Sequence, residues 1–143
     1  MDVSEPLLPL TPTAASPTQR LFPTLTAAQI ARIEAHGRRR PIARGDVLVE
    51  VGDKVVPFFV VARGEIQILR PSGESDTLIV VHGAGQFLGE GNMITGRRAL
   101  VRARVSESGE VIELDREQLL ALIQTDAELS EILMRASSSA APS

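Results

Sequence analysis

Short apolar segments separated by glycine-containing turns dominate the chain between residues 42 and 114. Their β-branched and aromatic residues favour strands, and each segment is far too short to cross a membrane as a helix. Regular short strands of this kind are typical of an antiparallel sandwich or barrel. We therefore expect a mainly β domain. The expected strands are Val47–Val49, Phe58–Val61, Ile66–Leu69, Leu78–Val81, Val101–Val105 and Val111–Leu114.

Capping patterns predict one helix before these strands and two after them. Thr26 and Gln29 have the spacing of a capping box, and Gly37 is the expected end of that helix. Asp115 and Asp126 are suited to cap the two later helices. The expected inward-facing residues of those helices are Leu119, Leu122, Ile123, Leu129, Ile132 and Leu133. The apolar stripe Leu129–Leu133 predicts a partner surface and hence a homodimer through the C-terminal helix.

The two ends of the chain differ in composition from the middle. Residues 1–21 contain repeated prolines among Ser, Thr and Ala, which predicts a disordered, extended tail. Residues 137–143 are rich in Ser and Ala and are expected to form a second disordered tail. The domain itself is therefore expected to span residues 22–136.

Composition excludes several classes of protein. The chain has 143 residues, enough for one domain with a core. Its net charge of -3 gives no electrostatic basis for binding nucleic acid or an acidic membrane, and we interpret the run Arg38–Arg40 as a solvated turn. The absence of cysteine excludes disulfides, thiolate metal sites and cysteine catalysis. No secretory signal is visible, and we expect a cytoplasmic location.

One segment, residues 85–99, combines closely spaced glycines with Glu90 and the pair Arg97 and Arg98. Backbone N–H groups and an arginine bind an anion well, and a carboxylate binds a hydroxyl. This segment is therefore the candidate site for a small anionic ligand.

Several motifs of the chain resemble, in order and approximate spacing, those of cyclic nucleotide-binding domains. Phe87–Glu90, followed by arginine and then Val101–Ala103, is similar to the phosphate-binding cassette of that family. The similar upstream motifs are Arg44–Leu48, Glu50–Asp53, Phe58–Ile66 and Gly83–Phe87. The resemblance covers roughly residues 22–135. It implies an antiparallel β-roll with a short N-terminal helix and C-terminal helices, without catalytic activity, which binds a cyclic mononucleotide and signals through its C-terminal helix. The first expected ligand is cAMP.

The resemblance also implies a role for individual residues. Glu90 would accept a hydrogen bond from the ribose 2′-hydroxyl, and glycines would let the backbone approach the phosphate. Counting back from Val101–Ala103 places Arg97 at the position of the phosphate-binding arginine. Strand alternation supports this choice, because Arg97 shares its parity with the apolar face whereas Arg98 does not. The expected ligand-binding residues are Gly89, Glu90, Gly91, Asn92, Arg97, Arg98 and Ala99.

The cassette departs from the family pattern in three ways. The spacing from Glu90 to Arg97 is shorter than usual, Gly91 and Asn92 replace apolar or small residues, and Arg98 stands where a small residue is common. An alternative function therefore stays open: a domain that binds no nucleotide and acts as a structural or interaction module. A third alternative is that the chain forms the regulatory part of a larger enzyme.

Other classes of site find little support in the sequence. The segment around Gly96 lacks the lysine and hydroxyl residue of a P-loop, and His36 and His82 do not form a metal-binding pair. No serine-hydrolase elbow is present. We expect no catalytic residue, metal or cofactor. The apolar residues considered for the lining around a base are Val61, Leu69 and Leu88.

Overall fold

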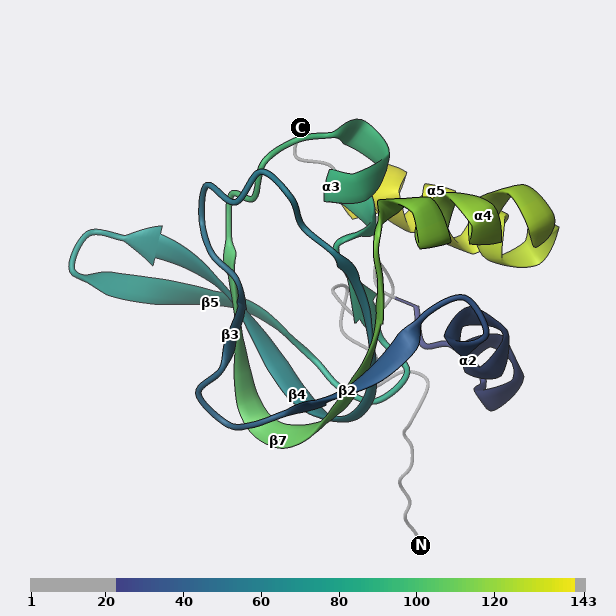
Figure 1. Ribbon diagram of the computed structural model, residues 1–143. Helices are drawn as coiled ribbons and strands as arrows, with labels where there is room; N and C mark the ends of the chain where they lie inside the picture. The colour runs from purple at the N-terminus through teal and green to yellow at the C-terminus, as the bar shows by residue number, and fades with distance from the viewer. Residues whose placement is uncertain (1–22, 141–143) are drawn as a thin grey trace, which may run out of the picture.

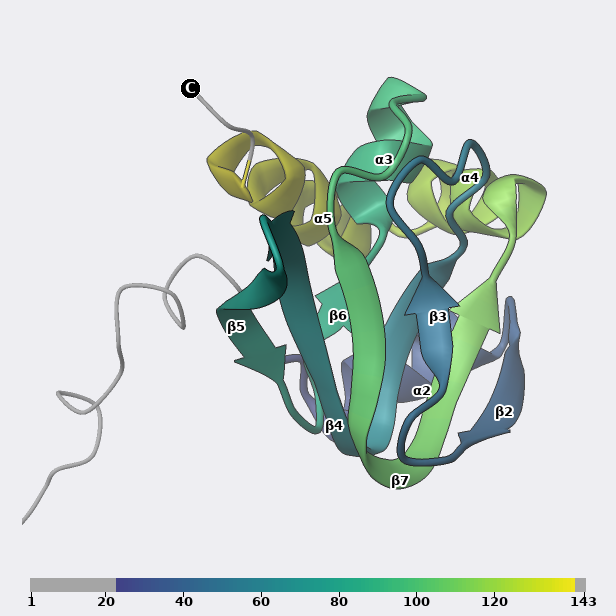
Figure 2. The same ribbon diagram turned by 90° about the vertical axis from the view of Figure 1, so that its left-hand side faces the viewer.

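An antiparallel sheet of six strands, curled into a roll, forms the body of the domain (Figures 1 and 2). The structure, a computed structural model, describes residues 23–140, so the predicted N-terminal tail lies outside the described residues. The strand order is β2-β7-β4-β5, with β3 paired to β7 and β6 paired to β4. The expected class, mainly β with flanking helices, is confirmed. The strands are β2 (Arg38–Ile42), β3 (Val47–Val49), β4 (Phe58–Ser72), β5 (Ser75–His82), β6 (Phe87–Leu88) and β7 (Arg102–Leu114).

β4 and β7 are long, and each joins two of the predicted strands into one. Both strands bend where Gly64 of β4 faces Gly109 of β7. A Cβ atom at Gly64 would lie 2.5 Å from the carbonyl oxygen of Glu107, and one at Gly109 would lie 2.1 Å from that of Arg63. Gly64 also has a φ of 95°, which favours glycine. These glycines therefore permit bends within continuous strands, and the prediction of turns at both places was wrong.

Within residues 23–140, four helices cover one side and one end of the roll (Figure 1). They are α2 (Ala27–Glu34), α3 (Glu90–Thr95), α4 (Arg116–Thr125) and α5 (Ala127–Ala140). The predicted capping box at Thr26 with Gln29 is confirmed, and Asp115 caps α4 as predicted, in a second capping box with Gln118. Asp126 caps α5 by accepting a hydrogen bond from the N–H of Leu129 at 3.1 Å. α3 lies within the segment 85–99 and supplies Glu90, Gly91 and Asn92 of the candidate site.

Two predictions near the first helix need correction. α2 ends at Glu34, before Gly37, and Gly37 instead lies so close to β7 that a Cβ atom there would be 2.3 Å from the Leu114 side chain. Residues 38–40 form β2 rather than a solvated turn. Arg39 is neutralised by Glu34, with 2.8 Å between the charged atoms, which allows an arginine-rich segment to pair with β7.

Consecutive residues of β4 supply two separate cores. Phe58 and Val60 pack among the helices, whereas Phe59 and Val61 pack inside the roll, and all four are fully buried. This follows from the strand geometry, in which successive side chains point to opposite faces. β4 therefore connects the helical layer to the interior of the roll.

α5 packs against the rest of its own chain. Leu129 and Leu133 are fully buried in the core between the helices and the sheet, so the apolar stripe already has a partner surface and no longer argues for a homodimer. Ala136 is also buried in this core, and the helix continues to Ala140. The C-terminal tail was therefore predicted to start too early. Residues 141–143 lie outside the described part.

Neither a membrane span nor a metal-binding cluster is found within residues 23–140. No helix there is long and apolar enough to cross a membrane, and no group of three or more histidine or carboxylate side chains is placed to hold a metal ion.

Candidate ligand-binding site

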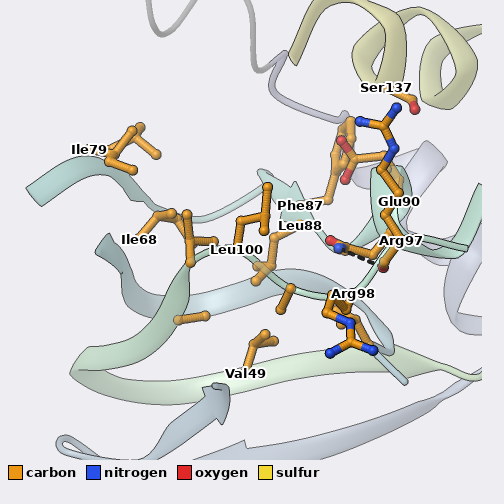
Figure 3. Close-up of a pocket in the computed structure, with 18 of the residues that line it drawn as sticks. Val49, Ile68, Ile79, Phe87, Leu88, Glu90, Arg97, Arg98, Leu100 and Ser137 are labelled. Atoms are coloured by element: carbon orange, nitrogen blue, oxygen red, sulfur yellow. Dashed lines mark hydrogen bonds between the residues drawn. The ribbon is translucent and has the colours of Figure 1, made fainter. Parts of the chain in front are cut away.

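A cavity of about 700 Å³ lies between the roll, the segment around α3 and the end of α5 (Figure 3). One wall is formed by the sheet, where Ile68 of β4 pairs in register with Val80 of β5 and Ala103 of β7. Ser137 of α5 lines the opposite side. The cavity thus has one wall made by three adjacent strands and a second wall made by two helices.

The structure brings all the predicted site residues together in this cavity. Its lining includes Gly89, Glu90, Gly91, Asn92, Arg97, Arg98 and Ala99. Of the residues considered for the lining around a base, Leu88 is present, whereas Val61 and Leu69 are buried in the core and do not line the cavity. The alternation of side chains along β4 was the signal that would have excluded Leu69.

Ser137 and Arg70 are among the lining residues that were missed from the sequence. Ser137 fell within the predicted tail, so its packing beside α3 was not considered. Arg70 lies just beyond the predicted strand Ile66–Leu69, and both Arg70 and Ser137 line the cavity. Extending the strand alternation by one step from Ile68 would have found Arg70.

Glycines and side-chain hydrogen bonds give the segment around α3 its shape. Gly89 has a φ of 94°, and a Cβ atom there would lie 2.2 Å from the carbonyl oxygen of Pro57, so only glycine fits. At the other end of α3, Asn92 Nδ2 donates to the carbonyl oxygen of Arg97 at 3.1 Å. Thr95 Oγ1 donates to the carbonyl oxygen of Gly91 at 2.6 Å. These bonds fix the backbone from which Arg97 extends.

Glu90, the first residue of α3, is a buried carboxyl in the cavity wall. Only 4% of its surface is exposed, and burial raises its pKa to about 7. No basic side chain within residues 23–140 forms an ion pair with it. Near neutral pH the group therefore changes between a neutral acid and a carboxylate that only accepts hydrogen bonds.

Arg97 and Arg98 extend in different directions from the same segment. Figure 3 shows the Arg97 side chain reaching toward Ser137, whereas Arg98 points away from α5. Both arginines are exposed and have no ion-pair partner in the described part of the chain. The assignment of Arg97 to the apolar face by strand alternation was wrong, because β7 begins only at Arg102 and the alternation does not extend back to residue 97.

His82 contributes a neutral polar group to the cavity wall. It is 2% exposed, burial lowers its pKa to about 4, and it is hydrogen-bonded to Gln86. Gln86 in turn accepts a hydrogen bond from the N–H of Gly83 at 2.9 Å. The imidazole is therefore uncharged at neutral pH and braces the turn that precedes the site.

Several solved structures are similar to this chain. The catabolite activator protein of Thermus thermophilus has 25% sequence identity and a TM-score of 0.66, and the match covers 80% of this chain and 56% of that protein. A structure from a cyclic-GMP-dependent signalling pathway that regulates bacterial phytopathogenesis has 29% identity and a TM-score of 0.69, and the match covers 80% of this chain and 91% of the other. This chain thus spans little more than half the length of the Thermus thermophilus protein.

A third similar structure supports the fold alone. It is the c-di-GMP-responsive global regulator CLP of Xanthomonas campestris, with 23% identity, a TM-score of 0.68, and coverage of 79% of this chain and 56% of that protein. No curated protein sequence matches the chain significantly.

The family model for the cyclic nucleotide-binding domain matches residues 39–126, which is more than half of the 143 residues. The matched region runs from β2 to the start of α5 and contains the whole segment 89–99 that lines the cavity. The chain therefore belongs to the family of cyclic nucleotide-binding domains.

Proposed function

We propose that this domain binds a cyclic mononucleotide in the cavity and transmits binding through α5, without catalysing a reaction. The observation that carries the proposal is that a buried carboxyl, two arginines without ion-pair partners in the described chain, and a side chain of α5 line one cavity. A cyclic mononucleotide offers a phosphate for the arginines and a ribose hydroxyl for the carboxyl.

The division of roles follows from direction and burial. Arg97 reaches toward Ser137 on the same side as Glu90 (Figure 3), so it is placed to bind a phosphate whose ribose contacts Glu90. Glu90 is most effective as the ionised acceptor, so ligand binding favours its carboxylate form. Arg98 supplies positive charge at the other side of the segment.

α5 is the element that we expect to respond to the ligand. A Cβ atom at Gly91 of α3 would lie 3.8 Å from Ser137 Oγ, so the end of α5 rests directly on the phosphate-binding segment. The proposed response is a shift of α5 between two positions. A ligand that binds this segment more tightly with α5 in one position shifts the population toward that position. The shift is limited by the difference between the affinities of the ligand for the two states.

Calorimetric titration with cAMP and cGMP tests the proposal. The cGMP arm is included because one similar structure comes from a cyclic-GMP-dependent pathway. We expect saturable binding that weakens about tenfold or more in Arg97→Met and in Glu90→Gln, since each loses a charge-assisted hydrogen bond. Glu117→Gln, an exposed position on α4, is the matched control and should bind like the wild type.

The competing function is a structural module that binds no nucleotide. The exposure of Arg97 and Arg98 favours it, since an exposed guanidinium is solvated and does not require an anion. Absence of heat, together with absence of thermal stabilisation at millimolar ligand, would establish this alternative, because a micromolar ligand should stabilise the fold by about 4 kcal/mol under those conditions.

A further inference from the structure

Two loop segments lie side by side next to the cavity and form one surface (Figure 2). They are residues 51–55, before β4, and residues 98–100, before β7. Two backbone hydrogen bonds join them at Ala99. The N–H of Gly52 donates to the Ala99 carbonyl oxygen at 2.8 Å, and the Ala99 N–H donates to the carbonyl oxygen of Asp53 at 2.9 Å. We call this surface the loop patch.

The apolar side chains of the loop patch are exposed to an unusual degree. Val55 is 81% exposed, Leu100 is 64% exposed and Val51 is 41% exposed. Among residues 23–140, Val55 is the most exposed large hydrophobic side chain. Removing such surface from water is favourable, and apolar side chains that gather on one exposed surface are typical of a docking site.

The loop patch carries positive charge, although the whole chain has a net charge of -3. Lys54 and Arg98 are exposed, and neither forms an ion pair in the described part of the chain. Asp53 is the acidic residue of the patch, and its side chain accepts a hydrogen bond from the N–H of Glu50 at 2.9 Å. Two basic residues against one acidic residue, among exposed apolar side chains, suit a partner that is both acidic and apolar.

The first ten residues of this chain have that complementary chemistry. They contain two acidic residues, Asp2 and Glu5, and no basic side chain. Pro6 and Pro9 favour an extended backbone, which loses little conformational freedom when it docks. The large apolar residues of the segment are Val3, Leu7, Leu8 and Leu10.

The loop patch lies within reach of this segment. The N–H of Leu25 donates to the carbonyl oxygen of Gly85 at 2.8 Å, so the chain joins the domain there. β6 leads from Gly85 to Gly89, which lies against the carbonyl oxygen of Pro57, two residues after the loop patch. Four residues of this path and two of the loop span about 20 Å at most, whereas residues 11–22 can extend over about 40 Å.

We propose that residues 2–10 dock onto the loop patch of their own chain. Their two carboxylates pair with Lys54 and Arg98, and their leucines cover Val55 and Leu100. Because Arg98 also lines the cavity, docking neutralises a cation at the ligand site. Docking needs no nucleotide and is therefore independent of the proposed function.

Paramagnetic labelling of the full chain, without nucleotide, tests this contact. The chain has no cysteine, so Ser4→Cys provides a single attachment point for a nitroxide label. We expect the amide NMR signals of residues 51–55 and 98–100 to lose the most intensity, relative to the same sample with the label reduced. The double variant Asp2→Asn, Glu5→Gln keeps the label and the chain length, and it should recover most of the lost intensity.

Matched variants of the domain separate the loop patch from charge in general. Lys54→Gln should recover intensity as the acidic double variant does, whereas Arg44→Gln, at another exposed cation, should not. The proposal is overturned if no signal loses intensity, if the loss is largest at another surface, or if the acidic double variant leaves it unchanged. A further sample mixes labelled chains with unlabelled, isotope-enriched chains. An equal loss there would assign the contact to a second copy and overturn docking within one chain.

Discussion

Glu90 and His82 line the same cavity with pKa values displaced in opposite directions by burial, to about 7 and about 4. The folded state binds more protons at Glu90 than the unfolded state between about pH 4.5 and 7, so this group lowers stability as the pH rises through that window. His82 binds fewer protons when folded between about pH 4 and 6.5, so it lowers stability as the pH falls. The two contributions oppose each other in the overlapping range.

Replacing the buried carboxyl should therefore change how the free energy of unfolding depends on pH. We expect Glu90→Gln to raise the free energy of unfolding at pH 8 by up to about 3 kcal/mol, because a displacement of one pKa unit corresponds to about 1.4 kcal/mol. At pH 4 the effect should be small, since the wild-type carboxyl is then neutral in the folded state and mostly neutral in the unfolded state. Urea unfolding at the two pH values measures this. A gain of equal size at both would show that packing, and not ionisation, is responsible.

At the scale of single elements, the sequence predicted what is encoded locally. The capping boxes of α2 and α4 involve residues three positions apart, Thr26 with Gln29 and Asp115 with Gln118. The first box and the capping role of Asp115 were predicted correctly. The bends of β4 and β7 were missed because glycine marks turns and close strand approaches alike. Only the contact of Gly64 with the partner strand β7 shows that this glycine marks a close strand approach and not a turn.

In the candidate site, too, the features that depend on contacts between distant parts of the chain were not predicted. Its residues were predicted from a resemblance and all line one cavity. The direction of Arg97 was misjudged because it depends on where β7 begins, and the contribution of Ser137 was missed because it depends on packing between α3 and α5. Neither is set by the residues next to it in the sequence.

Two glycines at the start of α3 should respond oppositely to the same change. Gly91 is helical, and an added Cβ atom would meet only Ser137 Oγ at 3.8 Å, so Gly91→Ala should stabilise the fold by up to about 1 kcal/mol through helix propensity. Gly89→Ala should destabilise it by more than that, because of the positive φ and the Pro57 carbonyl oxygen 2.2 Å away. Thermal unfolding of both variants checks the contrast. Destabilisation by Gly91→Ala would mean that α5 packs more tightly on α3 than described.

At the scale of the whole molecule, α5 is part of the core and not an external arm. Leu129 and Leu133 are fully buried, and the start of the helix is held to α2 by the ion pair of Arg32 with Asp126 at 2.8 Å. The helix is thus anchored at its beginning by α2 and by the core, while Ser137 near its end lines the cavity.

Truncation of a buried leucine on α5 should affect folding and not association. We expect Leu133→Ala to lower the free energy of unfolding by about 2–5 kcal/mol, as for other large-to-small changes in a core. Met134, the next residue, is 49% exposed, and Met134→Ser should leave stability nearly unchanged. Denaturant unfolding combined with sedimentation of both variants measures this. A shift from dimer to monomer in Met134→Ser would reveal an interface on the outer face of α5.

The paired bend at Gly64 and Gly109 also determines how the chain reaches its folded state. The carbonyl groups that each glycine approaches belong to the other strand, so neither bend is complete until residues far apart in the sequence have met. Closing that long loop costs chain entropy before the pairing returns any stabilisation, and domains dominated by such non-local pairing fold slowly. We therefore expect the folding of the domain to be slowed by pairing at this corner of the roll, which does not line the cavity.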